Sequence, residues 1–245
     1  MSRVIEKHRL FNFKQFSLSH HRSAMKIGTD GVLLGAWAGD KALRPGHILD
    51  VGCGCGLISM MIAQRYEHSI ITGIDIDGGA ICDARDNVNN SPWSERVDIV
   101  EGDFFCFKPA VKYDMILSNP PFFTADVHSP LPSRDMARSA QGFPIDDFAR
   151  KCVEILSATG SVSIIYPYSE KEKVCYAFYS NGLYMNRICY VRDSSDTPVK
   201  RVLMSFSQDR CDAPQEEYLS IRGEDKSWSE PYKDLTRCFH PQIED

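Results

Sequence analysis

The stretch that decides the fold is HILDVGCGCGLISMMIAQRY, which covers residues 47–66. Its first five residues form an apolar run typical of a buried β-strand, and residues 56–66 place apolar side chains at helical spacing. Between the two, Gly52, Gly54 and Gly56 allow the backbone to turn sharply and to approach a ligand closely. A strand, a glycine loop and a helix in this order are typical of nucleotide-binding α/β proteins.

The same alternation of strand-like and helix-like segments continues towards the C-terminus. It predicts a Rossmann-like α/β fold whose seven-stranded, mostly parallel sheet carries helices on both faces. Because the last two strands are joined by a loop alone, we also expect an antiparallel strand at the edge of the sheet. The expected strands are residues 47–51, 69–75, 97–103, 113–119, 160–167, 184–192 and 200–207. The expected helices are residues 31–38, 56–66, 78–90, 145–157 and 169–182.

Length and charge predict one domain with two extensions. The 245 residues suit a single α/β domain, with residues 43–208 as its core, 1–42 as a basic N-terminal arm that includes a helix, and 209–245 as an acidic C-terminal extension packed on the core. The net charge is −5, but residues 1–28 hold six basic side chains and one acidic side chain. Such an arm can grip phosphate or can simply be a solvated terminus, and charge alone favours neither.

The cysteines and the hydropathy pattern limit the cellular setting. Nine cysteines, most of them in apolar or helical patterns, argue against a disulfide framework and for a reducing compartment. Cys53 and Cys55 have no second Cys/His pair at zinc spacing, so we expect no metal. No apolar run approaches the roughly 18 residues of a membrane helix, and the N-terminus lacks a signal-peptide pattern. We therefore expect a cytoplasmic protein with no membrane contact; monomer and weak dimer both stay open.

Carboxylates end three successive predicted strands. Asp50 precedes the glycine loop, where it favours a cationic ligand over a dinucleotide phosphate. Asp75 ends the second strand, at the position where doubly wound folds place an acid for ribose hydroxyls. Asp103 ends the third strand and can accept a hydrogen bond from an adenine amine, while Phe104 can cover the ring. Together these residues predict a nucleoside ligand.

The motif SNPPFF, residues 118–123, follows the fourth predicted strand. A planar NH2 group is a poor nucleophile because its lone pair is delocalised. Two acceptors, the Asn119 side-chain oxygen and the Pro120 carbonyl, can hold both N–H bonds and draw the nitrogen towards tetrahedral geometry. Pro120 and Pro121 restrict the backbone, and Phe122 offers a stacking face worth about 1–3 kcal/mol. Methyl transfer at such a site depends on positioning and electrostatics rather than on a strong base.

These motifs resemble those of a known class of enzymes. The glycine loop, Asp75 and Asp103 are similar to those of Rossmann-like S-adenosylmethionine-dependent methyltransferases, and residues 119–122 resemble the motif shared by the members that methylate planar amino groups. FKQFSLSHHRSAMKIGTDGVLLGAWA (13–38) and ARDNVNNSPW (84–93) extend the resemblance to the bacterial tRNA1(Val) adenine-N6 methyltransferase family.

The resemblance implies a cofactor, a substrate and roles for individual residues. The cofactor would be S-adenosylmethionine, and the substrate the adenosine on the 3′ side of the anticodon, in the anticodon stem-loop of a tRNA. Lys26, Thr29 and Asp30 would form an N-terminal lid over the cofactor. The full set of expected cofactor contacts is Lys26, Thr29, Asp50, Gly52, Gly54, Gly56, Asp75, Asp103, Phe104 and Asn119.

RNA binding can also be argued from chemistry. The target base must leave its stack to reach Asn119, and this costs less in a loop than in a duplex. The candidate phosphate contacts are basic residues of the arm, of the polar segment after the motif and of the last predicted strand. They are Lys14, Arg22, Arg134, Arg138, Lys200 and Arg201.

Two other functions stay open at this point. Guanine-N2 methylation of rRNA uses the same motif chemistry, and a non-catalytic nucleoside-binding module could keep the fold. The intact motif at residues 119–122, together with Asp75 and Asp103, disfavours the second alternative, because a module without catalysis would be free to lose these residues.

Overall fold

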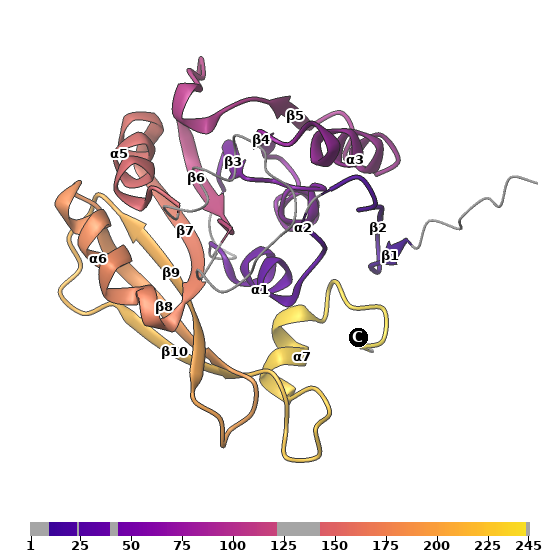
Figure 1. Ribbon diagram of the computed structural model, residues 1–245, viewed down its shortest axis with the longest axis vertical. Coiled ribbons are helices and arrows are strands. Elements are labelled where there is room, and N and C mark those ends of the chain that lie inside the picture. Colours follow the sequence, from indigo (N-terminus) through magenta and orange to yellow (C-terminus); the bar gives the residue numbers. More distant parts are fainter. Residues whose placement is uncertain (1–9, 24, 40–43, 122–142, 244–245) are drawn as a thin grey trace, which may run out of the picture.

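An eight-stranded sheet forms the centre of the protein (Figure 1), with the strand order β10-β8-β9-β7-β6-β3-β4-β5. The computed structural model describes residues 10–23, 25–39, 44–121 and 143–243. The strands are β3 (His47–Val51), β4 (Ile70–Asp75), β5 (Val97–Glu101), β6 (Tyr113–Ser118), β7 (Leu156–Pro167), β8 (Tyr184–Arg192), β9 (Val199–Ser207) and β10 (Gln215–Ser220). No helix among these residues has the length and apolar character needed to cross a bilayer.

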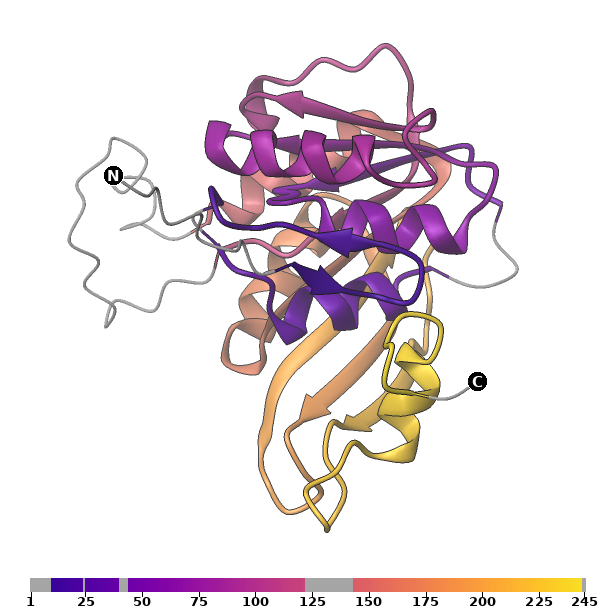
Figure 2. The same ribbon diagram turned by 90° about the vertical axis from the view of Figure 1, so that its right-hand side faces the viewer.

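Helices cover both faces of this sheet. Figure 1 shows α1, α2, α3 and α7 on one face and α5 and α6 on the other. The helices are α1 (Thr29–Trp37), α2 (Leu57–Arg65), α3 (Gly78–Asn89), α5 (Ile145–Ile155), α6 (Lys171–Ser180) and α7 (Glu230–Thr236), with short 3-10 turns η1 (Phe104–Cys106) and η2 (Tyr168–Glu170). A small hairpin of β1 (Phe11–Asn12) and β2 (Ser17–Leu18) lies across the layer of α1, α2 and α3 (Figure 2).

The expected Rossmann-like architecture is confirmed, with a difference at one edge of the sheet. The sheet has an eighth strand, β10, which lies in the acidic C-terminal extension and pairs in parallel with β8. The antiparallel strand is β9, but it lies between β7 and β8 rather than at the edge. The sequence of β10, QEEYLS, did not indicate a strand, because a mostly exposed edge strand carries few apolar residues.

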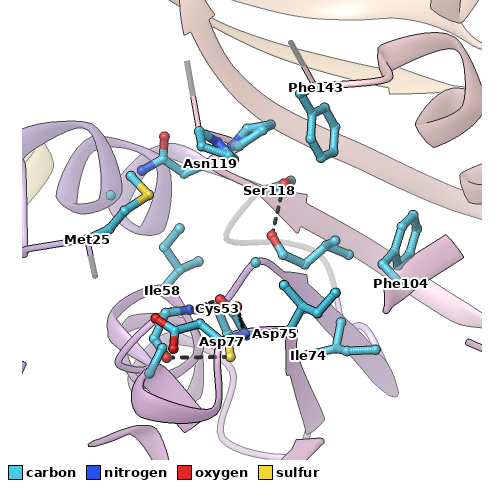
Figure 3. A pocket seen from close by; sticks show the side chains of 18 of the residues that line it. Met25, Cys53, Ile58, Ile74, Asp75, Asp77, Phe104, Ser118, Asn119 and Phe143 are labelled. Atoms are coloured by element: carbon cyan, nitrogen blue, oxygen red, sulfur yellow. Dashed lines mark hydrogen bonds between the residues drawn. The ribbon is translucent and has the colours of Figure 1, made fainter. Parts of the chain in front are cut away.

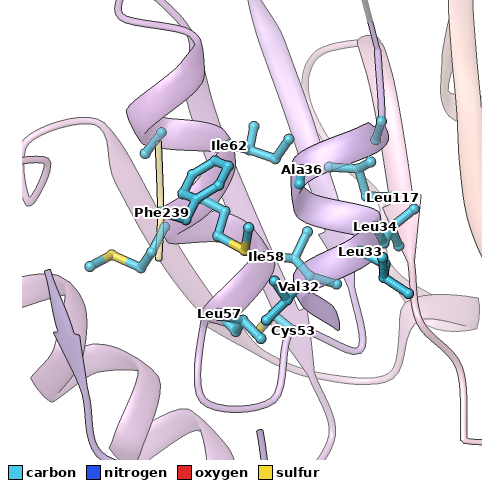
Figure 4. Packing of buried hydrophobic residues seen from close by; sticks show 14 of the residues in the cluster. Val32, Leu33, Leu34, Ala36, Cys53, Leu57, Ile58, Ile62, Leu117 and Phe239 are labelled. Carbon is cyan, nitrogen blue, oxygen red and sulfur yellow. The ribbon is translucent and has the colours of Figure 1, made fainter. Parts of the chain in front are cut away.

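Helix α1 is buried almost completely, and its sequence shows why. It is apolar on all sides, which is typical of a helix surrounded by other elements, and Leu33 and Leu34 have no exposed surface. Figure 4 shows the packing of α1 against α2, with Phe239 from the C-terminal segment joining the same cluster. Gly35 permits this close contact, because a Cβ atom there would lie 2.7 Å from the sulfur of Met61.

A polar network attaches the C-terminal extension to the end of α1. The Arg187 guanidinium donates to the Glu217 carboxylate at 2.6 and 3.1 Å, and also to the carbonyl oxygens of Trp37 and Gly39. The Trp37 indole N–H donates to the same carboxylate at 2.9 Å, and the guanidinium carbon lies 4.2 Å from the centroid of the Trp37 ring. These contacts join β10 of the C-terminal extension to β8 and to the end of α1.

Candidate active site

A cavity of about 1000 Å³ lies at the carboxyl ends of β3, β4 and β6 (Figure 3). In a parallel α/β sheet this edge is where ligands bind. The wall combines segments that are far apart in the sequence, which include the glycine loop after β3, the ends of the central strands and the N-terminal segment before α1. Of the expected cofactor contacts, the wall includes Lys26, Gly52, Gly54, Asp75, Asp103, Phe104 and Asn119.

The glycine loop presents bare backbone to this cavity. Gly52 and Gly54 have φ angles of +70° and +56°, which side chains other than that of glycine rarely adopt. A Cβ atom built on either residue would meet no atom within 4 Å. The loop is fixed from below, since the backbone N–H groups of Gly52 and Cys53 donate to the carbonyl of Ile74 at 2.8 and 3.1 Å. Gly56 lies outside the cavity wall and begins α2 with a φ of +87°.

Asp75, the last residue of β4, joins the glycine loop to that strand. Its carboxylate accepts hydrogen bonds from the backbone N–H groups of Gly54 at 2.8 Å and Asp77 at 2.9 Å. Burial raises the pKa of Asp75, although these two hydrogen bonds oppose the shift. Each carboxylate oxygen can accept a second hydrogen bond, so Asp75 fits a ligand hydroxyl as well as the loop. Asp77 has a separate role, because it caps α3 by accepting from the N–H of Gly79 at 2.9 Å.

Asp103 and Phe104 form the part of the wall that follows β5. The Asp103 carboxylate caps η1 by accepting a hydrogen bond from the backbone N–H of Phe105 at 3.0 Å. Phe104 is buried, and its ring lies 5.3 Å from that of Phe148 on α5. An apolar ring beside a carboxylate suits a flat heterocycle with an exocyclic amine, which is the combination expected from the sequence.

Besides Gly56, two expected cofactor contacts lie outside the wall of this cavity. Asp50 is fully buried beneath the loop, where it accepts hydrogen bonds from the backbone N–H and the hydroxyl of Ser59 at 2.9 and 2.7 Å. Burial raises the pKa of Asp50 to about 7. Thr29 begins α1 and lines a separate, smaller cavity. The sequence predicted both residues as cofactor contacts. The order of strands in a parallel sheet does not determine on which side of the loop the Asp50 carboxylate lies.

Asn119 holds the most unusual polar atom of the site. Its Oδ1 is buried and has no hydrogen-bond partner among the described residues. Figure 3 shows Asn119 and Asp75 on opposite sides of the cavity. A buried acceptor without a donor costs about 1–3 kcal/mol, and a ligand N–H group in the cavity could supply the missing hydrogen bond. Pro120 and Pro121 follow on the wall, while Phe122 lies outside the described residues.

The N-terminal segment that closes the cavity is held by α3. Lys26 is on the wall, and its ammonium donates to the carbonyl oxygens of His20 at 2.8 Å and Ser23 at 3.1 Å. Arg22 pairs with Asp83 at 2.7 Å and with Asp86, and hydrogen bonds from both carboxylates raise its pKa. Arg22, expected to contact RNA, therefore has an internal anchoring role in this structure.

The other expected RNA contacts also have specific surroundings. Lys200 pairs with Asp193, and the Arg201 guanidinium donates to the Asp30 carboxylate at 2.9 Å. The backbone N–H of Lys14 donates to the carbonyl of Phe239 at 2.8 Å. Arg134 and Arg138 lie outside the described residues.

The sequence reasoning missed one wall of the cavity. It is contributed by α5 and by Phe143, just before that helix, and includes Asp147, Arg150 and Lys151. These residues carry no motif, and the sequence predicted only a helix over residues 145–157. Among the residues described by the structure, no group of His, Cys, Asp and Glu side chains could hold a metal ion.

The fold and this site define a class I S-adenosylmethionine-dependent methyltransferase. Residues 29–143 match the Methyltransferase small domain family. A predicted O-methyltransferase from Agrobacterium tumefaciens has the same fold with a TM-score of 0.65 and 18% identity, covering 86% of this chain and 96% of that chain. A TehB-like SAM-dependent methyltransferase from Corynebacterium glutamicum gives a TM-score of 0.51 and 18% identity, covering 74% and 89%.

Sequence relatives identify the family within this class. The tRNA1(Val) (adenine(37)-N6)-methyltransferase of Phocaeicola vulgatus is 39% identical over 232 residues, covering 94% of this chain and 97% of the relative. The protein of the same name from Christiangramia forsetii is 36% identical over 237 residues, covering 95% and 98%. The chain belongs to the tRNA1(Val) (adenine(37)-N6)-methyltransferase family. This confirms the family that the sequence motifs indicated.

Proposed function

We propose that this protein transfers a methyl group from S-adenosylmethionine to N6 of the adenosine on the 3′ side of the anticodon in tRNA1(Val). Relatives that match nearly the whole chain carry the name of this activity. The observation in the structure that carries the proposal is the buried, unpartnered Oδ1 of Asn119 on the cavity wall. A binding module without catalysis would gain stability by losing such an atom.

The described residues fit the cofactor on three sides. The open space over Gly52 and Gly54 leaves room for a ligand against bare backbone. The Asp75 carboxylate would accept hydrogen bonds from ribose hydroxyls, and Asp103 would accept one from the adenine amine beside the Phe104 ring. When bound, S-adenosylmethionine would supply an electrophilic methyl group for the reaction.

Asn119 and Pro120 would act on the target amine. The Asn119 side-chain oxygen and the Pro120 carbonyl would accept hydrogen bonds from its two N–H groups, and this would localise the nitrogen lone pair. Ser118 holds the end of the strand in place, because its hydroxyl donates to the carbonyl of Val51 at 2.9 Å. A preorganised pair of acceptors lowers the barrier without reorganisation during the reaction. The nitrogen becomes more acidic as it is alkylated, so its proton can leave late.

The proposal also states where the reaction takes place. Bases of an anticodon loop are partly unstacked already, so turning one into the cavity costs less than from a duplex. The nine cysteines are all free thiols, which supports a reducing compartment such as the cytoplasm.

Nucleoside analysis tests the proposal directly. Purified protein would be incubated with radiolabelled S-adenosylmethionine and an unmodified tRNA1(Val) transcript, which is then digested to nucleosides. We expect label in N6-methyladenosine, and none when adenosine 37 is replaced by guanosine. Label in N2-methylguanosine would replace adenine by guanine as the target, and absence of label from every tRNA tested would overturn the proposal.

A further inference from the structure

Two exposed tyrosines and one half-buried tyrosine form a connected surface beside the active site. The rings of Tyr190 on β8 and Tyr218 on β10 stack with their centroids 5.1 Å apart and an interplanar angle of 21°. Tyr168 of η2 meets Tyr190 edge-on at 6.1 Å, and the ammonium of Lys171 lies 5.8 Å from the Tyr190 ring centroid. Tyr218 is 67% exposed and Tyr168 is 46% exposed. We call Tyr168, Tyr190, Tyr218 and Lys171 the tyrosine surface.

Strand register connects the tyrosine surface to the catalytic motif. Ser118 pairs with Ile164 of β7, so Pro120 lies level with Tyr166. Tyr166 pairs with Val202 of β9, Val202 pairs with Tyr190, and Tyr190 pairs with Tyr218. Neighbouring strands lie about 4.8 Å apart, so β8 and β10 are about 14 and 19 Å from β6 along this row. The tyrosine surface thus begins a few nucleotide lengths from Asn119.

Basic side chains border the same end of the sheet. Lys200 lies where the pairing of β8 with β9 shifts, because Val191 pairs with Arg201 and Arg192 pairs with Val199, so strand alternation does not place it on the face of Tyr190. A cavity of about 270 Å³ at the ends of β8 and β9 is lined by Arg192, Lys200 and Arg201, together with acids that include Asp30 and Asp193. These acids partly neutralise the bases, since Lys200 pairs with Asp193. Charge at this edge is therefore modest, and the exposed rings are its dominant chemistry.

We infer that the tyrosine surface is a stacking platform for unpaired bases of the substrate RNA. The inference rests on the proposed function, because it names where nucleotides next to the methylated base are held. Aromatic rings bind unpaired bases through their flat faces, with a lysine or arginine against the backbone. A tRNA loop that places one base in the cavity leaves its neighbours outside it, within reach of the row that leads to Tyr190.

Tyr218 offers a sharp test because it is exposed and has a matched control. Binding of an unmodified anticodon stem-loop would be followed by fluorescence anisotropy at several salt concentrations. We expect Tyr218→Ala to raise the Kd roughly 5- to 100-fold and to leave the slope of log Kd against log salt unchanged, since stacking releases no counterions. Tyr218→Phe should restore the wild-type Kd. Tyr176→Ala, at a 74% exposed tyrosine of α6 outside this surface, should bind as wild type.

Two further readouts separate the platform from a structural role and from failure of the proposed function. Binding of S-adenosylhomocysteine should be unchanged in Tyr218→Ala, and its KM for RNA should rise while kcat stays constant. If Tyr218→Ala lowers only the melting temperature, or if RNA binds it as tightly as it binds wild type, the platform is wrong and a protein partner becomes the better occupant. If the wild-type protein methylates no tRNA, the proposed function fails first, and the platform fails with it.

Discussion

The Asp83 carboxylate holds Ser23 by two hydrogen bonds of 2.9 Å, one from the backbone N–H and one from the hydroxyl. Asp83 is fully buried in α3, and it also accepts hydrogen bonds from the backbone and the guanidinium of Arg22 at 2.9 and 2.7 Å. Ser23 itself lines the cavity, as does Met25 two residues further on. A single carboxylate therefore fixes the segment that closes the cofactor site to a helix 60 residues away.

Asp83→Asn should loosen this attachment. The amide keeps one acceptor but brings an NH2 group to the donors of Ser23, so the free energy of unfolding should fall by about 1–3 kcal/mol. Cofactor affinity should fall as well, because Lys26 and its neighbours lose their fixed position. Urea unfolding and calorimetric titration with S-adenosylhomocysteine measure the two effects. Asp86→Asn is the control: this exposed partner of Arg22 should change stability by less than about 1 kcal/mol. Wild-type cofactor affinity in Asp83→Asn would contradict the anchoring role.

The same carboxylate predicts a weakness at acidic pH. Burial alone would raise the pKa of Asp83, but hydrogen bonds from Arg22 and Ser23 outweigh burial and hold that pKa below its usual value. A lowered folded-state pKa stabilises the protein above the unfolded pKa, about 3.9, and this contribution is lost as pH falls through the folded value. Urea midpoints measured between pH 5 and pH 2 should therefore fall less in Asp83→Asn than in wild type. Parallel curves would show that Asp83 titrates alike in both states.

Gly54→Ala should separate backbone strain from cofactor binding. At Gly54, with a φ of +56°, alanine should cost about 1–2 kcal/mol, and its methyl group would also project into the space over the loop. Gly182 is a matched control, because its φ is +78° and a Cβ there also meets no atom within 4 Å, but it lies outside the cavity wall. We expect both alanine variants to lose similar stability and only Gly54→Ala to lose cofactor affinity, by at least tenfold. Equal cofactor affinity in the two variants would remove the loop from the binding surface.

Local patterns predicted the residues that meet at the end of the sheet. Strand ends in a parallel sheet share one edge, so Asp75, Asp103 and Asn119 could be placed together from the order of the strands alone. Arg22 could not be assigned in this way, because its partners on α3 follow it by about 60 residues and no local pattern links them. A basic side chain near a terminus looks the same in a sequence whether it meets phosphate or an internal carboxylate.

The strand β10 was not predicted from the sequence, for a different reason. Leu219 is its one buried side chain, and the ion pair between Glu217 and Arg187 adds to the backbone pairing with β8 that holds the strand at the edge. The tyrosine surface depends on this strand, so it too was beyond prediction: Tyr190 and Tyr218 are neighbours only because β10 pairs with β8.

Asp50 should make stability depend on pH near neutrality. Burial is the main cause that raises its pKa to about 7; the hydrogen bonds from Ser59 oppose this rise and the Asp75 carboxylate adds to it. The folded state therefore binds the proton more tightly than the unfolded state, whose pKa is about 3.9. The contribution of Asp50 is complete below pH 4 and is lost as pH rises to 7, with an upper limit on the order of 4 kcal/mol.

Asp50→Asn, which stays neutral at every pH, tests this dependence. The difference in the free energy of unfolding between wild type and Asp50→Asn should shrink or change sign from pH 4 to pH 7 and then stay constant. Ser59→Ala should move the fall to higher pH, because it removes a hydrogen bond that stabilises the ionised form. A difference between wild type and Asp50→Asn that does not vary with pH would show that Asp50 is ionised throughout.

Asn119→Ala should lower activity strongly without a loss of stability. The buried Oδ1 has no partner among the described residues, so its removal takes away an unsatisfied polar atom, and we expect the free energy of unfolding to stay constant or to rise by up to about 1 kcal/mol. Loss of one of the two acceptors for the target amine should lower kcat about 100- to 1000-fold, as for other preorganised groups that act in the transition state. The affinity for S-adenosylhomocysteine should stay within a few-fold of wild type.

Ser118→Ala is the neighbouring comparison for this prediction. It removes a hydroxyl that is satisfied by the Val51 carbonyl, so it should lower stability by about 1 kcal/mol and reduce kcat only modestly. A stable Asn119→Ala variant with little activity, beside a less stable Ser118→Ala variant that keeps most of its activity, is expected only if the Asn119 oxygen binds the substrate. If Asn119→Ala instead destabilises the protein and retains most of its kcat, the amide supports the fold and the target amine is held by other groups.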